Sequence, residues 1–163
     1  STGVVSATGN VNGGNLRTTG LISSAGTVTG TSFVGVATSA QYADLAENYT
    51  ADADYAPGTV LEFGGPCEVT VAAEESVRVA GIVSTQPAHL MNSHLQAEHV
   101  VALALIGRVP CKVRGTINKG DMLVSGGDGY AIAKETPILG TVIGKAISSS
   151  TGDNIIEVVV GRS

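Results

Sequence analysis

The chain has 163 residues, a formal net charge of −5, two Phe, four Tyr and no Trp. A core of ordinary size must therefore consist mainly of Val, Ile, Leu and Ala, which suits short strands. Residues 44–98 hold nine acids and one base, whereas residues from 100 onward hold seven bases and five acids. Because the bases are scattered rather than clustered, we expect no nucleic-acid partner.

Membrane and redox signals are weak. The longest purely apolar run, residues 100–106, is far too short to span a bilayer, so we expect no membrane partner. The opening residues lack a signal-peptide pattern, which predicts synthesis in a cytoplasm. Cys67 and Cys111 match neither a zinc nor a redox spacing, and we interpret them as reduced thiols.

A 17-residue repeat occupies the first 33 residues. Residues 2–13 read TGVVSATGNVNG, residues 19–30 read TGLISSAGTVTG, and glycines and apolar residues coincide in the two copies. Four apolar side chains per unit cannot enclose a core, so neighbouring units or other chains must cover them, and two copies are too few for a self-supporting solenoid. The repeat predicts an intertwined trimeric β shaft, similar to a triple β-helix. Its shared apolar core would consist of Val4, Val5, Val11, Leu16, Leu21, Ile22, Val28 and Phe33.

The composition changes after the repeats. Gly accounts for 8 of the first 36 residues and for 14 of the other 127. We therefore assign residues 1–36 to the shaft, 37–56 to a collar or linker, and 57–163 to a head domain. A flexible Gly/Ser/Thr linker is the alternative for residues 1–36, although the regular apolar spacing would serve no purpose there.

The collar segment carries a helical spacing. Tyr42, Leu45, Ala46 and Tyr49 lie at i, i+3, i+4 and i+7, which predicts a short amphipathic helix over residues 40–48. Three such helices around one axis would bury Tyr42 and Leu45 in the trimer core. An extended conformation is the alternative, because so short a helix is marginal alone.

The head reads as short apolar segments separated by turn residues, which predicts an all-β barrel or sandwich. The motif SGGDG at residues 125–129 is the clearest hairpin connection. The nine expected strands cover residues 59–63, 68–72, 76–84, 99–106, 108–114, 121–125, 129–133, 140–147 and 155–161.

One polar loop, residues 86–98, interrupts these segments and contains Pro87. We expect it to be exposed, and we interpret His89, His94 and Gln96 as a candidate contact surface. His99 and Glu98 would complete a metal-ligand set, but the spacings match no known metal motif.

Signals for catalysis are absent. The chain has no G-x-S-x-G, no P-loop and no C-x-x-C motif. Its acidic residues between 44 and 54 also lack the alternating pattern of a calcium loop. We therefore expect no metal site and no cofactor.

Four stretches carry a family resemblance. Residues 18–33 (TTGLISSAGTVTGTSF), 42–65 (YADLAENYTADADYAPGTVLEFGG), 77–93 (VRVAGIVSTQPAHLMNS) and 101–125 (VALALIGRVPCKVRGTINKGDMLVS) resemble the C-terminal part of tailed-phage tail-fibre proteins. The chain is more distantly similar to the head of phage neck-appendage proteins that cleave themselves after trimerising. The resemblance implies a homotrimer with an intertwined β shaft and a β-rich head.

The self-cleaving relatives break the Ser-Asp bond of a Ser-Asp-Tyr-Ala-Glu motif, in which the Glu takes part. The matching residues here are Ala40, Gln41, Tyr42, Ala43 and Asp44. Gln41 and Asp44 would thus occupy the catalytic positions, but the scissile pair is absent. We therefore expect no enzyme activity at Ala40-Gln41.

The resemblance implies a structural virion protein, assembled in the host cytoplasm, that forms the distal part of a tail fibre. The head would bind a host cell-surface glycan or protein receptor, promote trimer assembly, or do both. Regions upstream of this sequence would join other fibre or baseplate proteins. The alternatives are an autoproteolytic maturation or chaperone domain of a phage appendage and a bacterial trimeric surface adhesin.

Overall fold

The computed structural model describes residues 8–9, 19, 23–25 and 44–161. The chain divides into two units, Ser1–Val36 and Ala37–Ser163. Gln41, Tyr42 and the eight apolar residues of the predicted shaft core lie outside the described residues, so the shaft stays a prediction. Of the predicted trimer core, the structure describes Leu45.

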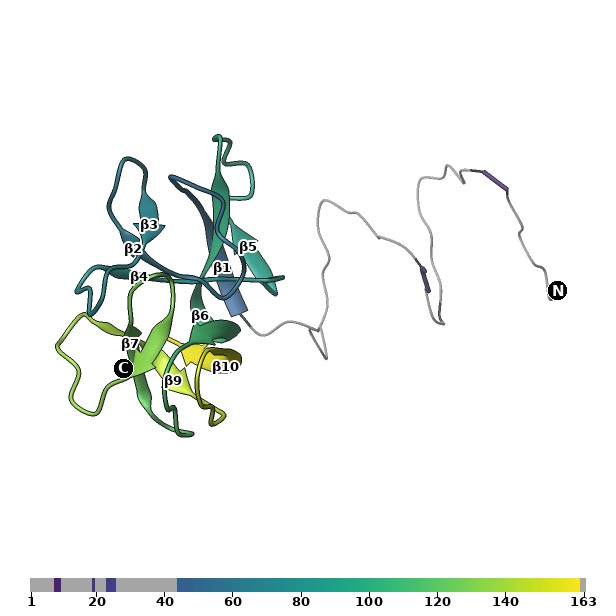
Figure 1. Ribbon diagram of the computed structural model, residues 1–163. Coiled ribbons are helices and arrows are strands. Elements are labelled where there is room, and N and C mark those ends of the chain that lie inside the picture. Colours follow the sequence, from purple (N-terminus) through teal and green to yellow (C-terminus); the bar gives the residue numbers. More distant parts are fainter. Residues whose placement is uncertain (1–7, 10–18, 20–22, 26–43, 162–163) are drawn as a thin grey trace. The chain divides into compact units, whose positions relative to one another are not determined.

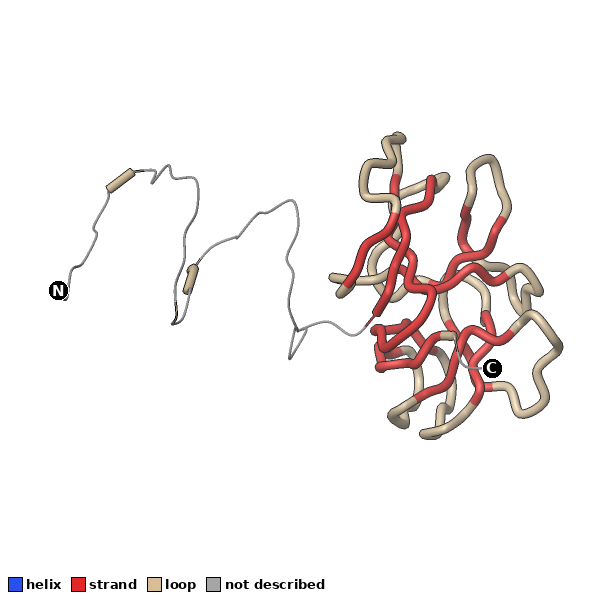
Figure 2. Tube along the Cα trace, turned by 180° about the vertical axis from the view of Figure 1, so that it is seen from behind, coloured by secondary structure: helices blue, strands red, loops and turns tan. Residues whose placement is uncertain are grey.

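The described residues form ten strands and no helix, which confirms the all-β prediction (Figures 1 and 2). The strands are β1 (Asp44–Thr50), β2 (Val60–Phe63), β3 (Val69–Val71), β4 (Val79–Val83), β5 (His89–Met91), β6 (Val100–Val113), β7 (Met122–Ser125), β8 (Ala131–Ala133), β9 (Val142–Ala146) and β10 (Asn154–Val160).

Strand β6 organises the head because its two halves pair with different strands. Its first half pairs antiparallel with β1 and β4, and its second half pairs antiparallel with β10 and parallel with β8. Strands β7 and β9 link β8 to β10, so five strands close into a β-barrel in the order β6, β8, β7, β9 and β10. Of the two predicted architectures, barrel or sandwich, these five strands form the barrel.

The remaining strands extend the sheet beyond the barrel. Strand β2 pairs with β3 and β4, and β1 pairs with β5 and β6. Neighbouring residues of β2 and β6 point to opposite faces. Val60 and Ala104 join the core inside the barrel, whereas Leu61 and Leu103 join a second apolar cluster with Val69. Both faces of these strands are buried, which explains their nearly continuous apolar sequence.

The helix predicted for residues 40–48 is wrong in its described part. Residues 44–50 form strand β1, which pairs with β6 along its whole length. A helix of two or three turns is marginally stable and forms no backbone hydrogen bonds with β6. A strand at this position pairs with the backbone N–H and C=O groups of β6. Residues 44–50 therefore belong to the sheet, although the sequence analysis assigned them to a collar or linker.

Two further differences concern β6 and β5. The segments predicted as separate strands, 99–106 and 108–114, form one strand that continues through Gly107, whose φ is 111°. The predicted loop 86–98 contains the short strand β5, which lies parallel to β1. The SGGDG hairpin is confirmed, since β7 and β8 pair antiparallel across it.

Candidate functional site

Asp44, which matches the acidic position of the self-cleavage motif, begins β1 and is buried. Ser84 donates a hydrogen bond of 2.6 Å from its Oγ to Asp44 Oδ2, and the backbone N–H of Ala88 donates to the Asp44 carbonyl at 2.9 Å. A buried carboxylate is tolerated only with such donors. These two hydrogen bonds therefore hold the start of β1 against the segment that follows β4. Gln41, the other residue at a catalytic position of the motif, lies outside the described residues.

The loop 86–98 is held against β1. Asn48 Nδ2 donates to the Asn92 carbonyl at 3.3 Å, and Asn92 Nδ2 donates to the Asn48 carbonyl at 3.1 Å. Asn92 has a φ of 53°, a left-handed conformation that Asn tolerates better than most residues. The loop is thus a built surface element, which leaves His89, His94 and Gln96 exposed.

The histidines do not gather into a metal site. His99 is half-buried, and its Nδ1 lies 2.9 Å from Asp54 Oδ1, whereas His89 and His94 are exposed on the loop. Within residues 44–161, no group of three His, Cys, Asp or Glu side chains is placed to hold a metal ion. Leu45 is half-buried on β1, where it pairs with Ile106 and His89.

Acidic side chains near β1 accept hydrogen bonds from neighbouring side chains. Asp52 accepts hydrogen bonds from the hydroxyls of Tyr55 at 2.6 Å and Thr70 at 2.7 Å, and these donors lower the pKa of Asp52. Burial, together with a hydrogen bond to Glu47, raises the pKa of Tyr49 to about 12. The hydrogen bond between Thr70 and Asp52 connects the turn after β1 to β3.

The two cysteines differ in environment. Cys67 is exposed, and Cys111 is buried in the barrel core. Burial raises the pKa of the Cys111 thiol to about 12. A thiol held protonated in this way is a poor nucleophile, which fits a packing role.

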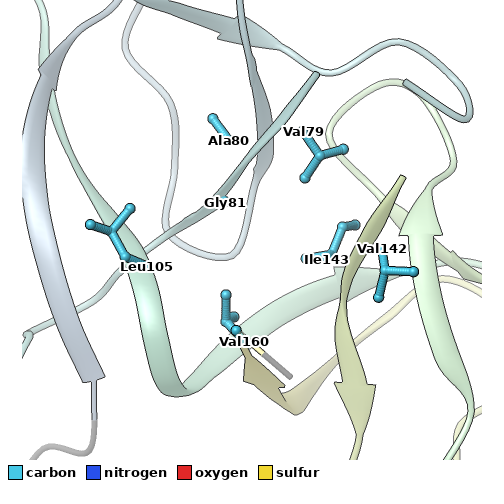
Figure 3. Close-up of a pocket in the computed structure, with 8 residues that line it drawn as sticks. Val79, Ala80, Gly81, Leu105, Val142, Ile143 and Val160 are labelled. Carbon is cyan, nitrogen blue, oxygen red and sulfur yellow. The ribbon is translucent and has the colours of Figure 1, made fainter. Parts of the chain in front are cut away.

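A hollow of about 210 Å³ opens where the barrel meets the rest of the sheet (Figure 3). Side chains of β4, β6, β9 and β10 surround it, including Val79, Leu105, Ile143 and Val160. Every described residue that lines it is apolar or Gly. Most of the surface inside the hollow is nevertheless polar, because backbone groups are exposed between these side chains, and the described lining holds no side-chain acid, base or nucleophile.

The sequence did not reveal this hollow. Its lining residues come from four strands that are far apart in the chain, and each belongs to a segment that reads as ordinary core. Two of the lining residues, Gly81 and Gly161, approach β6 so closely that a Cβ would lie 2.6 Å from the Ala104 carbonyl oxygen and 3.0 Å from Ile106 Cγ1, respectively.

No protein-family model and no curated protein matches the chain. Among solved structures it is similar to the N base of head fibre gp8.5 from bacteriophage phi29, with 18% sequence identity and a TM-score of 0.47. The match covers 73% of this chain and 95% of that chain.

The described residues therefore define an all-β protein with a closed five-stranded barrel, an exposed loop held against β1, and a hollow lined by apolar residues and Gly. No helix among them is long and apolar enough to cross a membrane.

Proposed function

We propose that the chain is a structural protein of a phage virion, the distal part of a trimeric tail fibre. The observation that carries this proposal is the 17-residue repeat, whose eight apolar side chains require the repeats of other copies for burial. The β-rich head that follows it is typical of a domain that ends or nucleates a fibre. Assembly takes place in the host cytoplasm, and upstream regions join other fibre or baseplate proteins.

The head takes part in host-surface attachment, in trimer assembly, or in both. Its exposed loop supports attachment, because hydrogen bonds to β1 hold it in place while His89, His94 and Gln96 stay accessible. Ordered loops on a rigid scaffold are common contact surfaces. The partner is a glycan or a protein of the host surface.

The experiment has two readouts. Sedimentation measures the mass at micromolar concentration, for which we expect three times the chain mass of 16.3 kDa. Adsorption of phage carrying this fibre is then compared between wild type and the variant His89→Ala, His94→Ala, Gln96→Ala. We expect reduced adsorption, and unchanged adsorption would exclude the loop as the contact surface.

A matched control replaces Ser148 and Thr151 by Ala. Both are exposed and lie outside the loop, between β9 and β10. We expect this variant to adsorb like wild type. A monomeric wild-type protein would contradict the fibre proposal itself.

We propose further that the chain is not an enzyme. Ala40-Gln41 replaces the scissile Ser-Asp of the self-cleaving appendage proteins, and this removes the hydroxyl and carboxylate available for local attack. The intact mass after days at room temperature distinguishes the two functions. A fragment beginning at or near Gln41 would favour the autoproteolytic maturation domain.

A further inference from the structure

A separate hollow lies on the outer face of the barrel, where β6, the residue before β8 and the start of β10 come together. It has a volume of about 340 Å³ and is lined by Lys112, Tyr130, Asp153, Asn154 and Ile155. Val113 of β6 pairs with Asn154 of β10 and with Ala131 of β8, so these three strands are neighbours at this point. We call this site the Tyr130 hollow.

The alternation of side chains along the strands places the hollow outside the barrel. Cys111 and Val113 of β6 and Ile156 of β10 join the barrel core. Lys112 and Ile155, which pair across β6 and β10, lie next to these core residues and therefore point to the opposite face. Ile155 is 58% exposed, so a molecule in solution can reach the hollow.

Arg114 holds two of the lining residues in place. Its Nε lies 3.4 Å from Asp153 Oδ1, and its Nη1 lies 3.6 Å from Asp128 Oδ2. The guanidinium carbon also lies 4.2 Å from the centroid of the Tyr130 ring, a cation–π contact. Arg114 is not among the lining residues, so the hollow is reached by a part of Tyr130 that Arg114 leaves uncovered. Side chains that are positioned before a ligand arrives lower the entropic cost of binding it.

The other polar side chains of the hollow can form further hydrogen bonds. Lys112 Nζ donates to Thr59 Oγ1 at 2.8 Å, which uses one proton of its ammonium group. Asn154 Nδ2 donates to Ser150 Oγ at 3.0 Å, and Asn154 Oδ1 accepts from the next backbone N–H at 2.8 Å. The amide nitrogen keeps a second proton and the amide oxygen a second lone pair. With the Asp153 carboxylate, the hollow therefore offers both donors and acceptors beside an aromatic ring.

We propose that the Tyr130 hollow binds a saccharide unit that carries no charge. A sugar ring has an apolar face of C–H groups and a rim of hydroxyl groups, each of which donates and accepts hydrogen bonds. Tyr130 and Ile155 supply apolar surface for the C–H face. Lys112 and Asn154 donate to the hydroxyl groups, and Asp153 accepts from them. A few polar groups placed around apolar surface are typical of small-molecule sites, and the volume lies at the lower end of their range of about 300–1,000 Å³.

The charges around the hollow favour an uncharged ligand because they balance. Lys112 and Arg114 each carry a positive charge, and Asp153 and Asp128 each carry a negative one. The inference rests on the proposed function only for the source of the saccharide, which is a glycan of the host surface. It does not require the trimer, and the hollow is a contact site distinct from the loop 86–98.

The test measures the binding of methyl glycosides to the full chain. The methyl glycosides of glucose, galactose, mannose and N-acetylglucosamine are added one at a time, and saturation-transfer NMR and a titration of protein NMR shifts detect binding. We expect at least one of them to bind with a Kd of about 1 mM, the affinity usual for so few contacting atoms. If none of the four glycosides binds, the inference is wrong.

Two substitutions to Arg locate the bound glycoside. Ile155→Arg should fill the hollow and weaken binding at least about tenfold. Ile138→Arg is the matched control, because Ile138 is 60% exposed, lies outside the hollow and receives the same charge. Exposed positions of this kind tolerate a long side chain, so both variants keep the fold. Unchanged binding by Ile155→Arg, or an equal loss in both variants, would overturn the inference.

A second pair of variants tests direct contact with Asp153. Asp153→Asn and Asp128→Asn each remove one ion-pair partner of Arg114, but only Asp153 lines the hollow. Asn also tolerates the φ of 52° at position 128. Asp153→Asn should raise the Kd about fivefold, because a carboxylate accepts a stronger hydrogen bond from a hydroxyl group than an amide does. Asp128→Asn should leave the Kd unchanged.

Equal Kd values for these two variants would exclude a saccharide bound against Asp153 and so overturn the inference. Such a failure is distinguishable from failure of the proposed function. Sedimentation tests the fibre, and the loop variant tests attachment, and neither measurement depends on the Tyr130 hollow.

Discussion

Two buried acids, Asp44 and Glu62, illustrate how single residues hold the head together. Ser84 donates to Asp44, while the backbone N–H of Ala73 at 2.9 Å and Arg78 Nη2 at 2.8 Å donate to Glu62. Each acid links segments that are distant in the sequence. Their donors compensate for the loss of water, so both acids act as structural groups in the described part of the chain.

Replacing Ser84 by Ala should lower the free energy of unfolding by about 1–3 kcal/mol, because the buried Asp44 carboxylate loses a hydrogen-bond donor. Urea denaturation of the variant and of wild type measures the difference. Ser93→Ala, at an exposed position of the loop, serves as the control and should leave the midpoint unchanged. Equal midpoints for both variants would show that the Asp44–Ser84 pair contributes nothing.

Glu62 should make stability depend on pH. Burial alone would raise its pKa, but hydrogen bonds from Ser76 and Ala73 and the charge of Arg78 outweigh burial and lower the pKa from its ordinary value of 4.5. The ionised side chain therefore stabilises the fold above pH 4.5, and this stabilisation is lost as the pH falls through the lowered pKa.

Glu62→Gln should accordingly be less stable than wild type at about pH 7, and the difference should shrink towards about pH 3. Urea denaturation across this range is the measurement. Glu135→Gln, at an exposed position, is the matched control. A difference that stays constant with pH would mean that the charge of Glu62 has no part in stability.

At the scale of elements, the barrel closes only because β9 approaches β10 very closely. A Cβ on Gly144 would lie 2.2 Å from the Val159 carbonyl oxygen, which no real contact permits. Gly144 pairs with Val160 across the two strands. The pairing of β9 with β10 therefore requires Gly at this position.

Gly144→Ala should cost more than about 3 kcal/mol, above the usual cost of overpacking, because backbone rather than a side chain must move. Gly152→Ala is the control. The φ of 71° at this position is unfavourable for Ala, but no atom lies close enough to contact the added Cβ, so we expect a loss of about 1–2 kcal/mol in the free energy of unfolding. Thermal unfolding compares the two. A Gly144→Ala protein as stable as Gly152→Ala would show that the strands separate at little cost.

At the scale of the whole molecule, the proposed trimer would depend on the repeats. Val28→Asp would place one charge per chain in the predicted shared interior, at a cost of several kcal/mol each. We expect residues 1–36 to become sensitive to protease and the trimer to dissociate at lower temperature. Thr29→Asp, one position along, places the same charge between apolar positions and should have little effect. Equal protease sensitivity of the two variants would contradict the shaft.

Much of the head could be predicted from the sequence, because apolar runs and glycine turns are local signals. The segments 59–63 and 121–125 contain β2 and β7 for this reason. For β1 the sequence favoured a helix, because Tyr42, Leu45 and Tyr49 fit a helical spacing, and left an extended conformation as the alternative. Pairing with the distant β6 decides for the extended one. Strand β5 was missed because its three residues depend on β1 alone. The hollow between β4, β6, β9 and β10 could not be predicted, because its lining residues come from four strands that are far apart in the sequence.

The order of the strands has a consequence for the timing of synthesis. Strand β6 pairs with β1, made before it, and with β10, which is the last strand of the sequence described here. A ribosome releases β10 only after every other strand has emerged, so the barrel stays open throughout translation of this segment. Such long-range pairing is slow compared with helix formation. The repeats therefore leave the ribosome before the barrel can close, and in the proposed trimer the heads of the three chains become ready for association only after β10 has emerged.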